Sequence, residues 1–156
     1  PTKFDAVRYA GADHAIDLSM TPLNDKLRDQ VYTATGGKGV DVVLDVVGGD
    51  VFDASLRTLV FGGRIVVLGF TSAKIPNIKS NYLLLKNIAA VGMTINGYFT
   101  QRPEIVNTAQ MAIFDLWRQG RIRPHIHAEL PLHEFAKAFE MLENREVIGK
   151  VVISLG

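Results

Sequence analysis

The sequence predicts an α/β fold in which a parallel sheet is flanked by helices. Helix-like and strand-like segments alternate along the chain, which is typical of such folds. The best strand candidate, residues 40–47 (VDVVLDVV), consists almost entirely of β-branched residues and Leu, a pattern typical of a strand buried on both faces. The chain has 156 residues, of which 47% are hydrophobic and 21% charged, so its size and composition are those of one globular domain.

Apolar periodicity and the glycines and prolines at segment ends predict the individual elements. Residues 22–35 carry Leu23, Leu27 and Val31 at four-residue spacing, which predicts a helix with one apolar face, ended by a glycine pair. The longest helix is expected at 103–119, with Pro103 near its first turn. The other expected helices are 2–9, 50–60, 81–86 and 132–144, and the expected strands are 14–18, 40–47, 64–70, 88–95 and 149–155, with extended chain at 122–130.

Charge and cysteine content exclude several classes of protein. The net charge is only +1, with 17 basic and 16 acidic residues, whereas a nucleic-acid footprint needs a clustered basic excess. No apolar run approaches the roughly 18 residues of a membrane span. The chain has no cysteine, so it has no disulfide framework, thiolate zinc site or thiol nucleophile. We therefore expect a cytoplasmic protein with no nucleic-acid or membrane partner.

Glycines at two strand ends mark a candidate ligand site. Parallel sheets bind ligands beyond the carboxyl ends of their strands, and two neighbouring strands end in Gly48-Gly49 and in Gly69. Glycine lets a flat ligand approach the backbone, but it also serves simply as a turn residue, so both interpretations stay open. Asp45 attracts interest because it lies near the carboxyl end of its strand.

The usual catalytic motifs are missing from the sequence. It contains no G-x-G-x-x-G, no Walker P-loop and no G-x-S-x-G. His125 and His127 would share one face of an extended segment, but no third ligand lies at a convincing spacing. We therefore predict no metal site and assign no catalytic residue.

Several sequence blocks occur in an order and with a spacing that match a known enzyme family. The blocks are GADHAID (11–17), GGKGVDVVLDVVGG (36–49), GGR (62–64), LGF (68–70), LLLKN (83–87), GRIRP (120–124) and GKVV (149–152). Together they resemble the zinc-independent quinone oxidoreductase branch of the medium-chain dehydrogenase/reductases. The resemblance covers the entire chain.

The resemblance implies that the chain is roughly the second half of such an enzyme. The fold would be a truncated Rossmann-type doubly wound parallel sheet, since the first β-α-β unit with its glycine loop and a GroES-like substrate domain would precede Pro1. Residues 1–120 would form the partial nucleotide-binding domain, and 121–156 would return to the substrate domain. In the strand order 3-2-1-4-5-6, the chain would supply strand 3 at 14–18 and then strands 4, 5 and 6.

The resemblance also implies the chemistry. Enzymes of this branch bind NADPH and pass hydride to a quinone or to the activated double bond of an enone or enoyl substrate, without zinc. The electron acceptor and the proton donor stay open. The matching cofactor positions are Lys3 at the 2′-phosphate, Leu18 at the adenine, Gly48 and Gly49 at the adenosine ribose, Leu68, Gly69, Phe70 and Thr71 beside the nicotinamide and its ribose, and Met93, Thr94 and Ile95 at the carboxamide.

Two alternatives and two further expectations accompany this interpretation. The chain could be a non-catalytic dimerisation or assembly module with the same fold, or a different doubly wound enzyme such as a methyltransferase.

Because the glycine loop supplies much of the dinucleotide affinity, we expect the 156 residues alone to be inactive. The strand from Ile88 to Ile95 would be outermost and contains no Lys, Glu or Pro, so we expect a homodimer through this edge.

Overall fold

The computed structural model describes residues 3–156; the expected first position of the N-terminal helix, residue 2, lies outside them. The chain divides into two compact units. One is Gly11–Gln101, and the other combines Arg102–Gly156 with the described residues up to Ala10.

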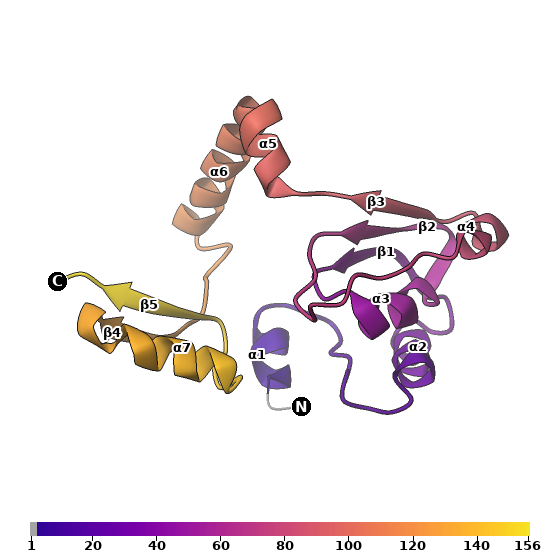
Figure 1. Ribbon diagram of the computed structural model, residues 1–156, viewed down its shortest axis with the longest axis horizontal. Helices are drawn as coiled ribbons and strands as arrows, with labels where there is room; N and C mark the ends of the chain where they lie inside the picture. The colour runs from indigo at the N-terminus through magenta and orange to yellow at the C-terminus, as the bar shows by residue number, and fades with distance from the viewer. Residues whose placement is uncertain (1–2) are drawn as a thin grey trace. The chain divides into compact units, whose positions relative to one another are not determined.

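The first unit contains a parallel sheet with helices, as the alternating pattern predicts (Figure 1). Its strand order is β1-β2-β3, which is also the order expected for strands 4, 5 and 6. The strands are β1 (Val40–Asp45), β2 (Leu59–Val67) and β3 (Ala89–Gly92), and the helices are α2 (Leu23–Ala34), α3 (Gly49–Leu56), α4 (Ser80–Lys86) and α5 (Ile95–Gln101).

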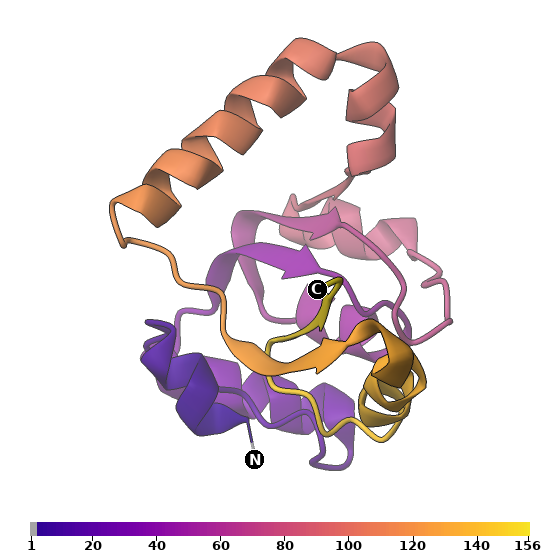
Figure 2. The ribbon, with the colours of Figure 1, turned by 90° about the vertical axis from the view of Figure 1, so that its left-hand side faces the viewer.

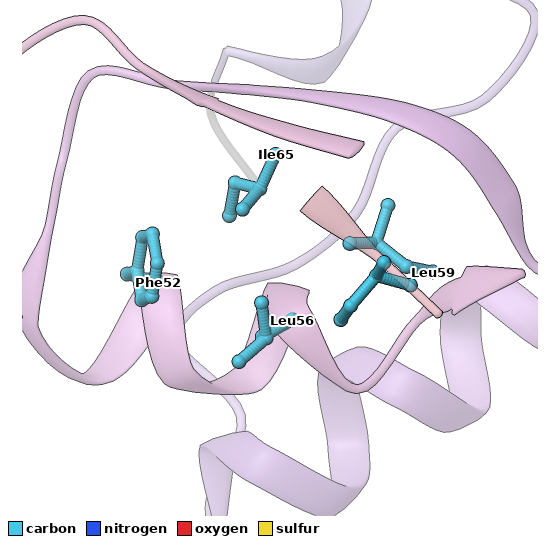
Figure 3. Close-up of a cluster of buried hydrophobic side chains, with 5 residues drawn as sticks. Phe52, Leu56, Leu59 and Ile65 are labelled. Atoms are coloured by element: carbon cyan, nitrogen blue, oxygen red, sulfur yellow. The ribbon is translucent and has the colours of Figure 1, made fainter. Parts of the chain in front are cut away.

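The core of this unit lies between α3 and the sheet. Phe52 and Leu56, four residues apart on α3, turn toward the strands and meet Leu59, Ile65 and Ile88 (Figure 3). Phe52 and Ile65 are fully buried, because the helical spacing of four and the strand spacing of two bring apolar side chains to one interface. Packing at this interface sets the position of β1 and β2 relative to α3.

The sheet is covered on one face, not on both as the run of β-branched residues predicts. Within β1, the side chains of Val42 and Leu44 are 50% and 67% exposed, whereas Asp45 is only 4% exposed. Val91 on β3 is 46% exposed. These side chains alternate along the strands with Val43, Ile65 and Ala90, which pack in the core, so the apolar run is buried mainly on its α3 side.

The second unit contains a parallel strand pair. The strands β4 and β5 run parallel, and the chain passes between them through α7, which lies beside the pair (Figures 1 and 2). The expected strand at 149–155 is thereby confirmed, and the extended segment at 122–130 contributes its partner. The elements are α1 (Phe4–Tyr9), α6 (Pro103–Arg118), β4 (Ile126–Pro131), the short 3₁₀ helix η1 (Leu132–Glu134), α7 (Phe135–Glu143) and β5 (Lys150–Ser154).

The expected strand at 14–18 is wrong. These residues run without regular structure, and a side chain takes the place of a neighbouring strand: the Asp17 N–H donates to Gln30 Oε1 at 2.7 Å, and Gln30 Nε2 donates to the Asp17 carbonyl at 3.0 Å. A strand is stabilised by a ladder of backbone hydrogen bonds, and no described strand pairs with this segment.

Three further boundaries differ from the prediction. The expected helix 50–60 ends at Leu56, and Leu59 already begins β2, because Thr58 closes a turn by donating from Oγ1 to the Ser55 carbonyl at 2.7 Å. The expected strand 88–95 ends at Gly92, and Ile95 begins α5. The expected strand 64–70 begins earlier, since Gly62 and Gly63 lie inside β2, where the register with β1 shifts.

Candidate functional site

The carboxyl ends of the three strands of the first unit lie in one row. Asp45 pairs with Val67, and Val67 pairs with Gly92, and each is the last residue of its strand. The segments that follow therefore leave the sheet side by side. We call residues 46–49, 68–71 and 93–95 the carboxyl edge. It contains nine of the predicted cofactor positions: Gly48, Gly49, Leu68, Gly69, Phe70, Thr71, Met93, Thr94 and Ile95.

Asp45 organises the first segment of the carboxyl edge. Its Oδ1 accepts the N–H of Val47 at 3.1 Å, and its two carboxylate oxygens accept the N–H of Gly48 at 3.2 and 3.1 Å. The chain then turns through Gly48 and Gly49, both at positive φ (75° and 53°), and enters α3. Sequence reasoning placed Asp45 near the strand end but missed that its carboxylate is occupied by the backbone.

The second segment is bonded to the first along its length. The N–H groups of Thr71 and Ser72 donate to the carbonyls of Val46 and Val47, both at 3.0 Å. A Cβ on Gly48 would lie 2.6 Å from the Lys74 carbonyl oxygen, so only glycine fits there. In contrast, a Cβ on Gly69 would meet nothing nearer than 3.6 Å. Packing within this chain therefore does not require glycine at position 69.

The third segment continues the same pattern. The N–H of Met93 donates to the Val67 carbonyl at 3.0 Å, and the chain then enters α5 at Ile95. The side chains of Met93 and Ile95 are 42% and 50% exposed. Apolar and aromatic side chains make up most of the lining of sites that bind small ligands.

Two predicted cofactor positions lie outside the carboxyl edge. Lys3 belongs to the second unit, where its Nζ donates to the carbonyl of Val147 at 2.7 Å. Leu18 lies in the irregular segment before α2 and is 45% exposed. In the same segment, the hydroxyl and the N–H of Ser19 donate to Asp17 Oδ1 and lower the pKa of that carboxyl group.

A cleft that the sequence did not predict lies elsewhere on the first unit. Its volume is about 430 Å³, and it contains none of the predicted positions. Two of its polar side chains are engaged within the chain, since Gln30 holds the backbone of Asp17 and the Thr33 hydroxyl donates to the Asp29 carbonyl. The carboxyl edge, which contains nine of the predicted positions, is the candidate that we develop below. The cleft is lined by His14, Ala15, Ile16, Met20, Lys26, Asp29, Gln30, Thr33 and Ala34.

The described residues contain no group of three His, Asp or Glu side chains close enough to hold a metal ion. His127, one of the two histidines weighed as ligands, accepts the N–H of Ile148 on Nδ1 at 3.4 Å. Within residues 3–156, no helix is long and apolar enough to span a membrane.

Comparison with known proteins identifies relatives over almost the whole chain. The family model described as zinc-binding dehydrogenase matches residues 10–153. Quinone oxidoreductase-like protein 2 from Mus musculus is 40% identical over 93% of this chain and 40% of its own length. Acryloyl-coenzyme A reductase from Metallosphaera sedula is 34% identical over 74% of this chain and 32% of its own length.

Solved structures give the same pattern. The Escherichia coli quinone oxidoreductase complexed with NADPH is 28% identical with a TM-score of 0.81, over 97% of this chain and 46% of that one. A mycobacterial quinone oxidoreductase is 27% identical with a TM-score of 0.80, over 96% of this chain and 45% of that one. The chain thus spans less than half the length of each of these relatives.

Proposed function

The chain belongs to the quinone oxidoreductase branch of the medium-chain dehydrogenase/reductases, as part of their C-terminal region, and we propose that it forms part of the nucleotide site of an NADPH-dependent oxidoreductase. The main support for this proposal is the register of the sheet, which pairs the last residues of the three strands, Asp45, Val67 and Gly92. This register brings the backbone of the three carboxyl-edge segments together, although they are far apart in sequence.

The resemblance assigns the carboxyl-edge segments to different parts of the dinucleotide. The turn at Gly48 and Gly49, which is buried against residues 70–74, would support the chain beside the adenosine ribose. The nicotinamide would lie at Gly69 and Phe70, with its carboxamide at the backbone of Thr94. When bound, NADPH supplies a hydride from its nicotinamide ring, which reduces a quinone or an activated alkene by two electrons. The chain contributes orientation, and we assign no proton donor among its residues.

The roles that we propose for Lys3 and Leu18 rest on the resemblance alone. We propose that the Lys3 ammonium binds the 2′-phosphate of NADPH, because a cation at a phosphate forms a strong, charge-assisted hydrogen bond. This role requires the ammonium to exchange the Val147 carbonyl, its present partner, for the phosphate. Leu18, which is exposed, would cover the adenine.

We also propose the domain assignment that the resemblance implies. Residues 1–120 would belong to the nucleotide-binding domain and 121–156 to the segment that returns to a GroES-like substrate domain. The two compact units instead divide between Gln101 and Arg102. The boundary at 120 therefore rests on the resemblance and not on the packing of this chain.

We further propose that the reaction requires no zinc held by these residues. The name of the matched family refers to zinc, but the chain has no cysteine and its described histidines and carboxylates form no ligand set. Activity that survives dialysis against a chelator, in a protein free of zinc by atomic absorption, would support this. Activity lost on chelation and restored by zinc alone would contradict it.

We propose a homodimer through β3. It is an edge strand of the described sheet, and it has none of the charged residues or prolines that usually prevent edge pairing. A two-fold axis would pair β3 with its copy in an antiparallel arrangement. The same edge would serve the alternative function, a non-catalytic assembly module, so enzymatic activity is what separates the two functions.

The test is NADPH oxidation by the full-length protein, with a quinone and with an enoyl thioester as separate acceptors. We expect turnover with at least one acceptor and little turnover by the 156 residues alone, since the sequence lacks the glycine loop that binds a pyrophosphate. A full-length protein that forms dimers but oxidises NADPH with neither acceptor would favour the assembly module. Robust turnover by the 156 residues alone would contradict the expected inactivity.

A further inference from the structure

Asp45 is a buried carboxylate whose partners are all backbone groups. It is 4% exposed, and its hydrogen bonds come from the N–H groups of Val47 and Gly48. None of the ion pairs among the described residues involves it. A buried charge is costly unless it is hydrogen-bonded. The N–H groups of the turn supply these hydrogen bonds, and the same bonds stabilise the conformation of the turn.

The chemistry of this position favours aspartate over asparagine. Both carboxylate oxygens accept the Gly48 N–H, at 3.2 and 3.1 Å. An asparagine offers one oxygen and one NH₂ group, and the NH₂ group is a donor only. In either orientation of the amide, a donor would then face the Gly48 N–H.

The turn held by Asp45 is also the support of the neighbouring segment. The carbonyl of Asp45 accepts the Leu68 N–H at 2.8 Å, and the next two carbonyls accept the N–H groups of Thr71 and Ser72. The Lys74 carbonyl lies against the Cα of Gly48, where a Cβ would come within 2.6 Å of it. Two of the three carboxyl-edge segments therefore take their positions from the turn at residues 46–49.

We propose that Asp45 is a positioning residue for the nucleotide site: its carboxylate fixes the turn at Gly48 and, through that turn, the backbone of residues 68–74. The proposal rests on the proposed function, because it assigns a role in binding NADPH. Asp45 touches no reacting atom in this account. It acts on the cofactor through the two segments that it holds.

The experiment compares Asp45→Asn with Asp41→Asn in the full-length protein. Asp41 lies on the same strand and is exposed, so its substitution makes the same change of charge without disturbing the turn. The readouts are Kd for NADPH, KM and kcat, and hydrogen–deuterium exchange of the Thr71 and Ser72 amides. For Asp45→Asn we expect Kd and KM to rise about tenfold or more, kcat to change less than about twofold, and the two amides to exchange faster. Asp41→Asn should match the unsubstituted protein.

The outcomes separate the two proposals. If the unsubstituted protein binds no NADPH, the proposed function is wrong and the role of Asp45 is wrong with it. If it binds NADPH and Asp45→Asn binds equally well, only the positioning role is wrong. A parallel loss of kcat and thermal stability without a change in KM would mean a purely structural residue. If Asp45→Asn does not fold, Asp45→Ser, which keeps one acceptor oxygen, is measured in the same way, and failure of both to fold overturns the positioning role.

Discussion

The N–H of Gly48 donates to both carboxylate oxygens of Asp45, at 3.2 and 3.1 Å. This pair of bonds joins the end of β1 to the residue before α3, and the chain then enters the helix through a φ of 75° at Gly48. The geometry links a buried charge to a position that only glycine adopts without strain. The first prediction follows from it.

Gly48→Ala should destabilise the protein more than Gly62→Ala does. Both glycines have positive φ, 75° and 77°, so alanine is strained at either position, and Gly48 also has ψ of −165°, a region that is essentially restricted to glycine and costs other residues about 1–3 kcal/mol. A Cβ at Gly48 would additionally lie 2.6 Å from the Lys74 carbonyl, whereas one at Gly62 would meet nothing within 4 Å. We expect an extra loss of about 1–3 kcal/mol in the free energy of unfolding, measured by urea denaturation. Equal losses would show that the packing at Gly48 is looser than described.

Phe52→Ala should be among the most destabilising substitutions in the first unit. Phe52 is fully buried in the core under the sheet (Figure 3), and truncation of a buried phenylalanine typically costs about 3–5 kcal/mol. Phe61→Ala is the matched control, because Phe61 is 77% exposed and should change the unfolding free energy by less than about 0.5 kcal/mol. If both variants lose a similar amount of unfolding free energy in the same denaturation experiment, Phe52 is not a main contributor to the core.

Much of the fold could be predicted because its signals are local or periodic. The run of β-branched residues at β1 predicted a parallel strand, and the four-residue spacing of Leu23, Leu27 and Val31 predicted α2 to within one residue at each end. Parallel strands share one carboxyl edge, so glycines after two of them pointed to the edge that the register now aligns. These features depend on the chemistry of short segments.

The failures depend on partners that a single segment does not reveal. Residues 14–18 have a strand-like composition, but the Gln30 side chain occupies the backbone of Asp17 and no described strand pairs with them. The start of α5 at Ile95 was missed because its β-branched residue continues the apolar pattern of β3. The role of Asp45 was missed because alternation along a strand gives the face of a side chain and not its hydrogen bonds.

Gly92→Pro should convert the proposed homodimer into a monomer. The Met93 N–H donates inward to Val67, and since successive N–H groups of a strand point in opposite directions, the Gly92 N–H faces the free edge. Proline removes this donor, and a Cβ at Gly92 would meet nothing within 4 Å, so we expect the sheet still to form. Gly92→Ala keeps the donor and should stay dimeric. An unchanged dimer mass for Gly92→Pro in light scattering would exclude pairing through β3.

Lys3→Met should weaken the binding of NADPH but not of NADH. Only NADPH carries the 2′-phosphate, and loss of its charge-assisted hydrogen bond should raise Kd by about tenfold. Fluorescence titration of both cofactors against the full-length protein measures the ratio. If the bond from Lys3 to the Val147 carbonyl is the whole role of this side chain, both affinities will change equally or not at all, and thermal stability alone will fall.

Amide hydrogen–deuterium exchange of the full-length protein, with and without NADPH, locates the nucleotide site. We expect NADPH to slow exchange in the three carboxyl-edge segments, 46–49, 68–71 and 93–95, which leave the sheet after Asp45, Val67 and Gly92. Exchange in α4 (Ser80–Lys86) should be unchanged and serves as the internal control. Protection confined to the cleft between residues 14–16 and α2, with none at the carboxyl edge, would contradict the account.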